Sequence, residues 1–163
     1  MSGRLDGARA VVVTCSTRAA AGVYPDRAGA LAVSTLRGWG ADVADATVVP
    51  DGPQVGEALA AALAARPDLL LTSGGTGLGP LDRTPEATAP LLDRAVPGIG
   101  EAVRAAGVAA GVPTAVLSRG LAGVAGSTLV VNLPGSTGGV RDALEVLGAV
   151  LPHALSQLRG GDH

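Results

Sequence analysis

The chain has 163 residues, of which 47% are apolar and 16% are charged. This balance excludes an intrinsically disordered chain, and the length is that of one globular domain with its own core. The net charge of -2 argues against nucleic acid as a partner, because binding to a phosphate backbone needs a basic surface.

Several residue types are too scarce for whole classes of site. Cys15 is the one cysteine, which excludes an internal disulfide and a cysteine-rich zinc site. His153 and His163 are the two histidines, and both lie too near the C-terminus for a histidine-rich metal site within one chain. There is no lysine, so a Walker-type phosphate loop and Schiff-base chemistry are excluded.

The chain shows neither a membrane-spanning nor a signal segment. No apolar stretch approaches the roughly 20 residues that cross a bilayer. The first residues, MSGRLD, lack an apolar signal region. We therefore expect a cytoplasmic protein with no membrane partner.

The first half of the chain predicts alternating strands and helices. Residues 10–15 read AVVVTC, an apolar β-branched run typical of a buried parallel strand. A helix over 27–38 and a strand over 42–49 follow. The next helix starts at 51–53 and carries Val55, Leu59, Ala62 and Leu63 on one face. A third buried strand spans 68–72.

The second half begins with a glycine-rich loop over 73–83. We expect the next helix to be capped by Thr84 and interrupted at Pro90. The pattern then predicts, in order, a helical stripe over 99–110, strands over 114–117 and 128–131, a helix carrying Val140, Leu144, Leu147 and Leu151, and a separate short helix over 153–159.

This alternation is typical of a parallel sheet that helices cover on both faces. The sequence contains no linker, internal repeat or low-complexity tract. It therefore predicts a single three-layer α/β/α domain over residues 1–163, with a mostly parallel central sheet.

Two glycine-rich loops follow predicted strands, at the sheet edge where open parallel sheets bind ligands. The first, SGGTG over 73–77, can form an anion-binding nest from backbone N–H groups. The second runs over 132–139, with hydroxyl groups on Ser136 and Thr137. Each loop also has a plainer interpretation, as a tight turn or as a helix cap at Ser136 or Thr137. Two such loops at one edge predict a shared phosphate site.

Charged residues follow the same strands. Right-handed connections bring Asp51 and Asp82 to one edge, where two carboxylates beside phosphates are typical of a Mg²⁺ site. Plainer roles stay open: Asp51 at a turn or helix start, and Asp82 paired with Arg83. Arg18 is a candidate anion ligand in place of the missing lysine, or a surface arginine. Glu86 is expected to favour the positive end of its helix.

Together these motifs resemble the molybdopterin adenylyltransferase family of molybdenum cofactor biosynthesis, of the MogA/MoaB type. The resemblance extends over about residues 11–158. It is carried by LTSGGTG (71–77), DRTPEAT (82–88), PGIGE (97–101), LSR (117–119) with Ala122-Gly123, and NLPGS (132–136), and also by Ser16, Arg18, AGVY (21–24) and Asp26-Arg27.

The resemblance implies Mg²⁺-dependent transfer of AMP from ATP to the terminal phosphate of molybdopterin, giving adenylyl-molybdopterin and pyrophosphate. It makes Asp51 and Asp82 the catalytic and metal-binding acids, with 74–77 on the nucleotide side and 132–136 at the pterin phosphate. The substrate-binding residues that it implies are Ser16, Arg18, Ser73, Gly74, Gly75, Thr76, Gly77, Ser118, Arg119, Asn132, Pro134, Gly135 and Ser136. A homotrimer and a molybdenum-insertion protein as partner are implied as well.

Three residues depart from the family pattern: Thr17 and Ala28 replace the frequent Asp and Ser, and Leu81 replaces the frequent Arg. The changes at 28 and 81 remove two phosphate contacts. They keep open an alternative, a catalytically weak or inactive molybdopterin-binding or assembly protein of the same fold. Other nucleotide chemistry, as in fused competence-damage-type proteins, is a third hypothesis that the single predicted domain disfavours.

Overall fold

A central β-sheet forms the middle layer of the computed structural model, which describes residues 4–161. Within that range the sheet has seven strands in the order β2-β1-β4-β7-β6-β5, with β3 also paired to β1. The strands span Arg9–Cys15 (β1), Asp42–Val43 (β2), Thr47–Val49 (β3), Leu69–Ser73 (β4), Arg94–Ala95 (β5), Ala122–Ala125 (β6) and Thr128–Leu133 (β7). All pairs among β1, β2, β3, β4 and β7 are parallel, and β6 is antiparallel to β5 and β7.

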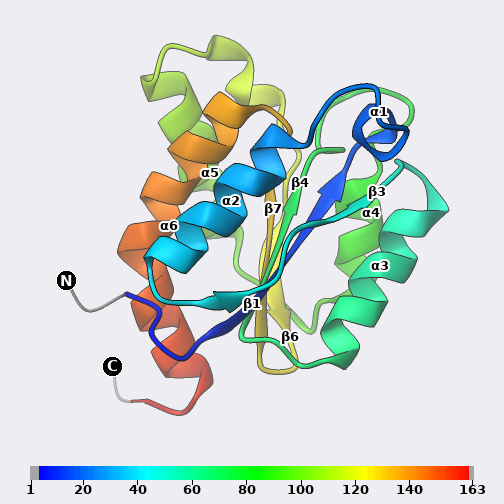
Figure 1. Cartoon of the computed structure of the whole chain (residues 1–163). Helices are drawn as coiled ribbons and strands as arrows, with labels where there is room; N and C mark the ends of the chain where they lie inside the picture. Colours follow the sequence, from blue (N-terminus) through cyan, green and yellow to red (C-terminus); the bar gives the residue numbers. More distant parts are fainter. Residues whose placement is uncertain (1–3, 162–163) are drawn as a thin grey trace.

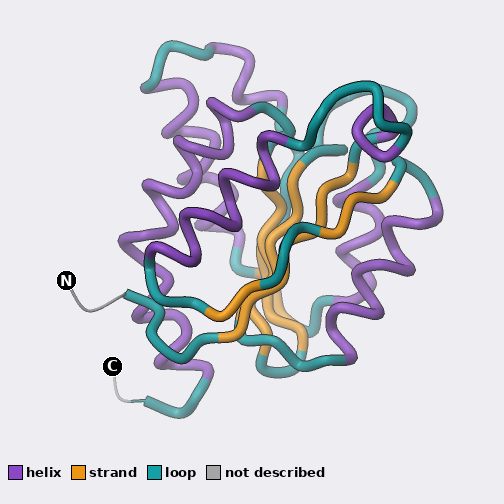
Figure 2. Tube along the Cα trace, viewed as in Figure 1, coloured by secondary structure: helices purple, strands orange, loops and turns teal. Residues whose placement is uncertain are grey.

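Helices cover both faces of this sheet. They span Thr17–Ala20 (α1), Arg27–Gly38 (α2), Pro53–Ala64 (α3), Thr84–Thr88 (α4), Pro97–Ala109 (α5) and Thr137–Leu158 (α6), with 3₁₀ turns at Ala89–Leu91 (η1) and Pro113–Leu117 (η2). Figure 1 shows α2, α5 and α6 on one face and α3 and α4 on the other. The same three layers are visible in Figure 2, which confirms the predicted α/β/α fold with a mostly parallel sheet.

The core consists of aliphatic side chains in two clusters, one on each face of the sheet. Strand β4 contributes to both: Leu69 and Leu71 belong to the larger cluster, with α2 and α6, and Leu70 belongs to the smaller one, with α3. Alternate side chains of a strand point to opposite faces, so a strand covered on both sides needs apolar residues at every position. This explains the unbroken apolar runs of β1 and β4.

The carboxyl ends of β1, β4 and β7 lie side by side. Thr14 is in register with Ser73, and Ser73 with Leu133. The two glycine loops therefore leave neighbouring strands at one edge, as predicted. They are joined directly, because Gly74 N–H donates to the Leu133 carbonyl over 3.1 Å and the Ser73 hydroxyl donates to the Pro134 carbonyl over 2.9 Å.

The predicted strand over 114–117 is wrong, because this segment forms η2. Pro113 starts a helical turn there, and no residue of η2 is buried. The sheet position next to β7 is occupied by β6, which lies between the two predicted strands, in a segment with no predicted strand. Its AGVA sequence lacks the alternating large apolar residues that identify a strand.

The other differences concern short or interrupted elements. The predicted strand over 42–49 is divided into β2 and β3, which both pair with β1. The predicted short helix over 153–159 is the end of α6, which continues through Pro152 because Leu147, Leu151 and Leu155 remain on one buried stripe. The interruption at Pro90 is confirmed by the change from α4 to η1.

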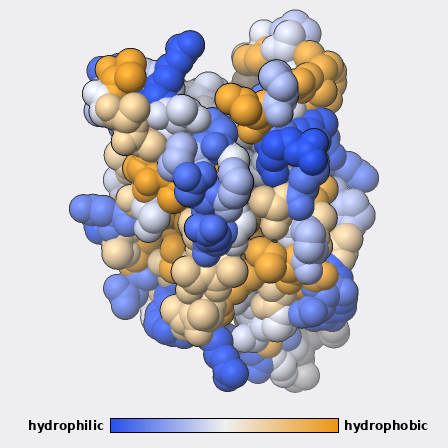
Figure 3. Space-filling model, turned by 90° about the vertical axis from the view of Figure 1, so that its right-hand side faces the viewer, coloured by the Kyte–Doolittle hydropathy of each residue, from blue (hydrophilic) through white to orange (hydrophobic). Residues whose placement is uncertain are grey.

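The outer surface over α3 mixes charged, polar and apolar side chains. Figure 3 shows this face, with a notch at its upper end between two projecting parts. Among residues 4–161, no helix combines the length and the apolar character that crossing a membrane requires.

Candidate functional site

The two glycine loops contact each other through their backbones. Gly74 has a φ of +96°, and a Cβ at this position would lie 2.3 Å from the carbonyl oxygen of Cys15. A Cβ on Gly135 would lie 3.2 Å from the Cα of Gly74. Glycine is therefore required where the loops meet, and any larger residue would push them apart.

Gly75 leaves space for two polar groups. Its φ is +70°, and a Cβ here would lie 2.1 Å from the Thr84 hydroxyl oxygen and 3.2 Å from Oδ1 of Asp51. Thr84 is 1% exposed, and within residues 4–161 its hydroxyl is the one buried side-chain polar atom without a hydrogen-bond partner. The predicted capping role is wrong, because Arg83 is the cap residue of α4 and Thr84 is already helical. The hydroxyl lies beneath Gly75, out of contact with solvent, near the Asp51 carboxylate and close enough to the Cys15 thiol to lower the pKa of that thiol.

Asp51 is held by Thr17, the first residue of α1. Its Oδ2 accepts hydrogen bonds from the Thr17 hydroxyl (3.1 Å) and from the Thr17 N–H (3.3 Å). The Asp51 N–H donates in return to the Thr17 hydroxyl oxygen over 3.1 Å. This reciprocal pair joins the end of β3 to α1 and fixes the direction of the carboxylate.

Asp82 lies at the far end of the first loop. Its Oδ2 accepts a hydrogen bond of 2.9 Å from the Gly79 N–H. Arg83 forms its ion pair with Glu86 at 4.0 Å, so the Asp82–Arg83 pairing that the sequence left open is not formed. Glu86 does more than favour a helix end, because it also binds Arg119 at 2.7 Å.

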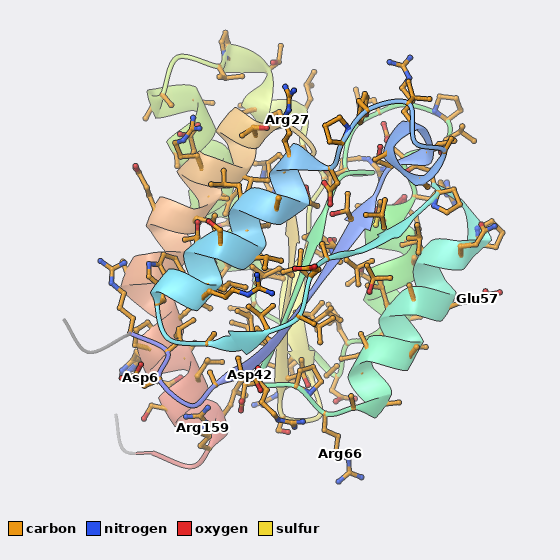
Figure 4. All side chains as sticks on the ribbon, viewed as in Figure 1. Asp6, Arg27, Asp42, Glu57, Arg66 and Arg159 are labelled. Carbon is orange, nitrogen blue, oxygen red and sulfur yellow. The ribbon has the colours of Figure 1, made fainter. Side chains whose placement is uncertain are left out.

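A cavity of about 540 Å³ lies over the carboxyl ends of β1 and β4. Its lining includes Ser16, Asp51, Ser73, Asp82 and Ser136. Arg27 at the start of α2 also lines it, and Figure 4 shows this arginine at the upper end of the helix, away from Arg66 and Arg159 at the opposite end of the molecule. The cavity therefore presents carboxylates, hydroxyls and an arginine within a lining that is otherwise partly apolar.

A second cavity of about 370 Å³ adjoins the first. Its wall comes from α5, η2 and the turn between them, including Val103, Leu117 and Val112, and its lining is mostly apolar. Four residues line both cavities: Gly75, Asp82, Gly135 and Ser136. Two cavities with a shared rim can hold two ligands whose reacting groups meet at that rim.

Comparison with known proteins identifies the family of this chain. A family model described as a probable molybdopterin binding domain matches residues 11–153. The chain belongs to this family.

Curated members of the molybdopterin-binding family cover most of the chain. The molybdenum cofactor biosynthesis bifunctional protein of Synechococcus elongatus is 45% identical over 163 residues, 99% of this chain and 51% of that protein. A molybdopterin adenylyltransferase of Haemophilus influenzae is 34% identical over 142 residues, 82% of this chain and 70% of that protein. The chain spans about half the length of the two bifunctional relatives that it matches.

Solved structures of related proteins have the same fold. The Mog protein of Mycobacterium ulcerans has a TM-score of 0.89 and 52% identity, covering 93% of this chain and 99% of that chain. The tungsten cofactor synthesizing protein MoaB of Pyrococcus furiosus has a TM-score of 0.85 and 31% identity, covering 93% and 97%. The family and the fold that the sequence resembles are thereby confirmed.

Most of the predicted site residues line one of the two cavities. The residues in the lining are Ser16, Asp51, Ser73, Gly74, Gly75, Thr76, Gly77, Asp82, Ser118, Pro134, Gly135 and Ser136. Ser136 is also the cap of α6, where its hydroxyl accepts from the Gly139 N–H over 3.0 Å, so the plainer interpretation of this residue is confirmed.

Three predicted residues line neither cavity. Arg18 is exposed on α1. Asn132 is 3% exposed, and its side chain bonds Leu121, Thr72 and Thr88 in the interior. The Arg119 guanidinium is bound to the loop that carries Asp82.

Sequence reasoning did not assign Thr17, Thr84 or Arg27 to the site. Thr17 contacts Asp51 across 34 positions of sequence, and the buried position of Thr84 under Gly75 depends on the fold. Arg27 had a usable signal, since an arginine in the first turn of a helix after a predicted strand is well placed to meet an anion.

The donor set is suitable for a hard cation such as Mg²⁺. Within the described residues, hydrogen bonds reach Oδ2 of both Asp51 and Asp82 and leave each Oδ1 available. No group of three or more His, Cys, Asp or Glu side chains in residues 4–161 is placed to hold a metal. Two carboxylates are the usual protein share of a Mg²⁺ site that is completed by phosphate oxygens and water.

Proposed function

We propose that the chain is a molybdopterin adenylyltransferase of molybdenum cofactor biosynthesis. The observation that carries this proposal is the pair of adjoining cavities with Asp82 and three loop residues on their common rim. ATP and molybdopterin are two phosphorylated substrates that must meet at one phosphorus atom. The names of relatives such as the Haemophilus influenzae enzyme support the same activity.

The reaction needs positioning more than it needs a covalent group from the protein. A terminal phosphate oxygen of molybdopterin attacks the α-phosphorus of ATP, a new P–O–P bond forms, and the bond to pyrophosphate breaks. Backbone N–H groups of 74–77 would hold the nucleotide phosphates, and 132–136 would hold the pterin phosphate. Such transfers depend on alignment and on stabilised negative charge, which these loops supply.

Asp51 and Asp82 would hold Mg²⁺, which when bound neutralises charge on the phosphate oxygens. Thr17 keeps the Asp51 carboxylate directed through the hydrogen bond from its hydroxyl. Arg27 would add positive charge at the nucleotide end of the larger cavity. The chain's own contribution is therefore a charged, preorganised frame around the reacting phosphorus.

One observation favours a second candidate, a molybdopterin-binding or assembly protein with little or no catalysis. Ala28 lines the larger cavity with a methyl group where a hydroxyl would contact phosphate. Leu81 is 64% exposed and lines neither cavity. Ala28 therefore supplies no hydrogen bond to a phosphate, and Leu81 adds no positive charge to the loop that carries Asp82.

A pyrophosphate-release assay distinguishes the two candidates. Wild-type protein with Mg²⁺, ATP and molybdopterin should release pyrophosphate only when all three are present. Asp51→Asn and Asp82→Asn should each lower the rate by roughly 100-fold, since each removes one charge from the reacting centre. Asp45→Asn is the matched control, because Asp45 is an exposed carboxylate paired with Arg37 outside the site.

Absence of pyrophosphate together with tight molybdopterin binding would overturn adenylyl transfer and support the binding protein. We also propose a cytoplasmic homotrimer that passes its product to a molybdenum-insertion protein, on the strength of the family resemblance. Light scattering tests the trimer by its mass.

A further inference from the structure

Arg119 lies between η2 and β6, against the loop that ends at Asp82. Its Nε donates to the Gly77 carbonyl over 2.9 Å, and its Nη2 donates to the Asp82 carbonyl over 2.6 Å. Nη1 donates to both carboxylate oxygens of Glu86, over 3.0 and 2.7 Å. The Arg119 backbone N–H also bonds the Thr76 carbonyl over 2.8 Å. One side chain thus contacts the start and the end of the Gly77–Asp82 segment.

This segment has little else to hold it. Its other described hydrogen bonds are local, between Gly79 and Asp82. Among residues 4–161, the hydrogen bonds that connect 77–83 to a distant part of the chain all come from Arg119. Glycines at 77 and 79 add conformational freedom that these contacts must restrain.

Glu86 keeps the guanidinium in place. The hydrogen bond from Arg119 holds the pKa of Glu86 below its ordinary value, and the charges of Arg119 and Arg83 act in the same direction. Both side chains are about one-third exposed, so the ion pair alone adds little stability. Its geometry matters more, because the planar guanidinium presents fixed, well-separated donors to two carbonyls and a carboxylate.

We propose that Arg119 and Glu86 act together as a positioning pair for Asp82, rather than as substrate ligands. The pair fixes the loop backbone on both sides of Asp82 and so directs its carboxylate to the rim that the two cavities share. The consequence for catalysis rests on the proposed function, whereas the restraint on the loop does not.

Hydrogen exchange of the ligand-free protein tests the restraint directly. Arg119→Lys keeps the positive charge but loses the planar guanidinium and its several donors, and Glu86→Gln keeps the side-chain shape but loses the negative charge. Amides of 77–83 should exchange at least about tenfold faster in Arg119→Lys and less strongly faster in Glu86→Gln, while β7 keeps its protection. Arg37→Lys is the matched control, because Arg37 also binds a carboxylate, on Asp45, and a carbonyl, on Val43, far from this loop.

Unchanged exchange of 77–83 in both variants would overturn the proposal. Loss of protection in β7 as well as in the loop would show that the Arg119→Lys protein is generally unfolded. In that case the milder Glu86→Gln variant tests the proposal. Unaltered loop exchange in a folded Glu86→Gln protein would also overturn the proposal.

A double-mutant cycle tests whether Arg119 acts through Asp82. Arg119→Lys should lower pyrophosphate release about tenfold in the wild-type background and less than twofold in the Asp82→Asn background, because the carboxylate to be positioned is then absent. An equal loss in both backgrounds would contradict the positioning role. If wild-type protein releases no pyrophosphate, the proposed function fails, and the exchange experiment still decides on the pair.

Discussion

Cys15 lies at the end of β1, 3% exposed, next to the groups that form the site. Burial raises the pKa of its thiol to about 11; the Thr84 hydroxyl opposes this rise, and the Asp51 carboxylate adds to it. At pH 8 only roughly one thiol in a thousand is ionised, and the thiolate is the reactive form. Cys15 is therefore a packing residue rather than a nucleophile.

We predict that native protein reacts with iodoacetamide at pH 8 at least about 100-fold more slowly than protein in denaturant. Mass spectrometry of the Cys15 peptide measures both rates. Rapid labelling of folded protein would contradict the buried, protonated thiol.

At this scale the sequence predicted the acids and the loops but not the groups that hold them. The shared location of Asp51 and Asp82 could be predicted, because strand order and right-handed connections bring both residues to one edge of the sheet. The contacts of Thr17 and Glu86 could not be predicted, because their partners are 34 and 33 positions away in the sequence. A pairing of side chains leaves no periodic signal.

Among the elements, α6 carries the largest share of the buried apolar side chains. Val140, Leu144, Leu147, Leu151 and Leu155 form one stripe along it that packs in the larger core cluster. The stripe predicted the first part of the helix correctly. It did not predict the continuation, because proline normally ends a helix and only burial on both sides of Pro152 outweighs that tendency.

We predict that Leu147→Ala lowers the free energy of unfolding by about 2–5 kcal/mol, since Leu147 is fully buried and its removal leaves a cavity. Urea denaturation followed by circular dichroism gives the value. Val150→Ala is the matched control on the same helix, because Val150 is 39% exposed, and it should cost less than about 1 kcal/mol. Equal losses in both variants would contradict this packing.

At the scale of the whole molecule, the parallel part of the sheet brings three strand ends together and the helices leave that edge open. Composition and alternation predicted this architecture, because it depends on patterns within single segments. The second cavity could not be predicted, since it depends on how α5 and η2 stand beside the second glycine loop. The adjoining cavities are the feature on which the proposed reaction depends.

Calorimetric titration tests this feature most directly. The ligands are molybdopterin and α,β-methylene-ATP, an ATP analogue that cannot release pyrophosphate, with Mg²⁺ present. We predict that each ligand binds one site per chain and that saturation with one leaves the stoichiometry of the other unchanged. Competition between the two for a single site, or failure of either to bind, would contradict the account.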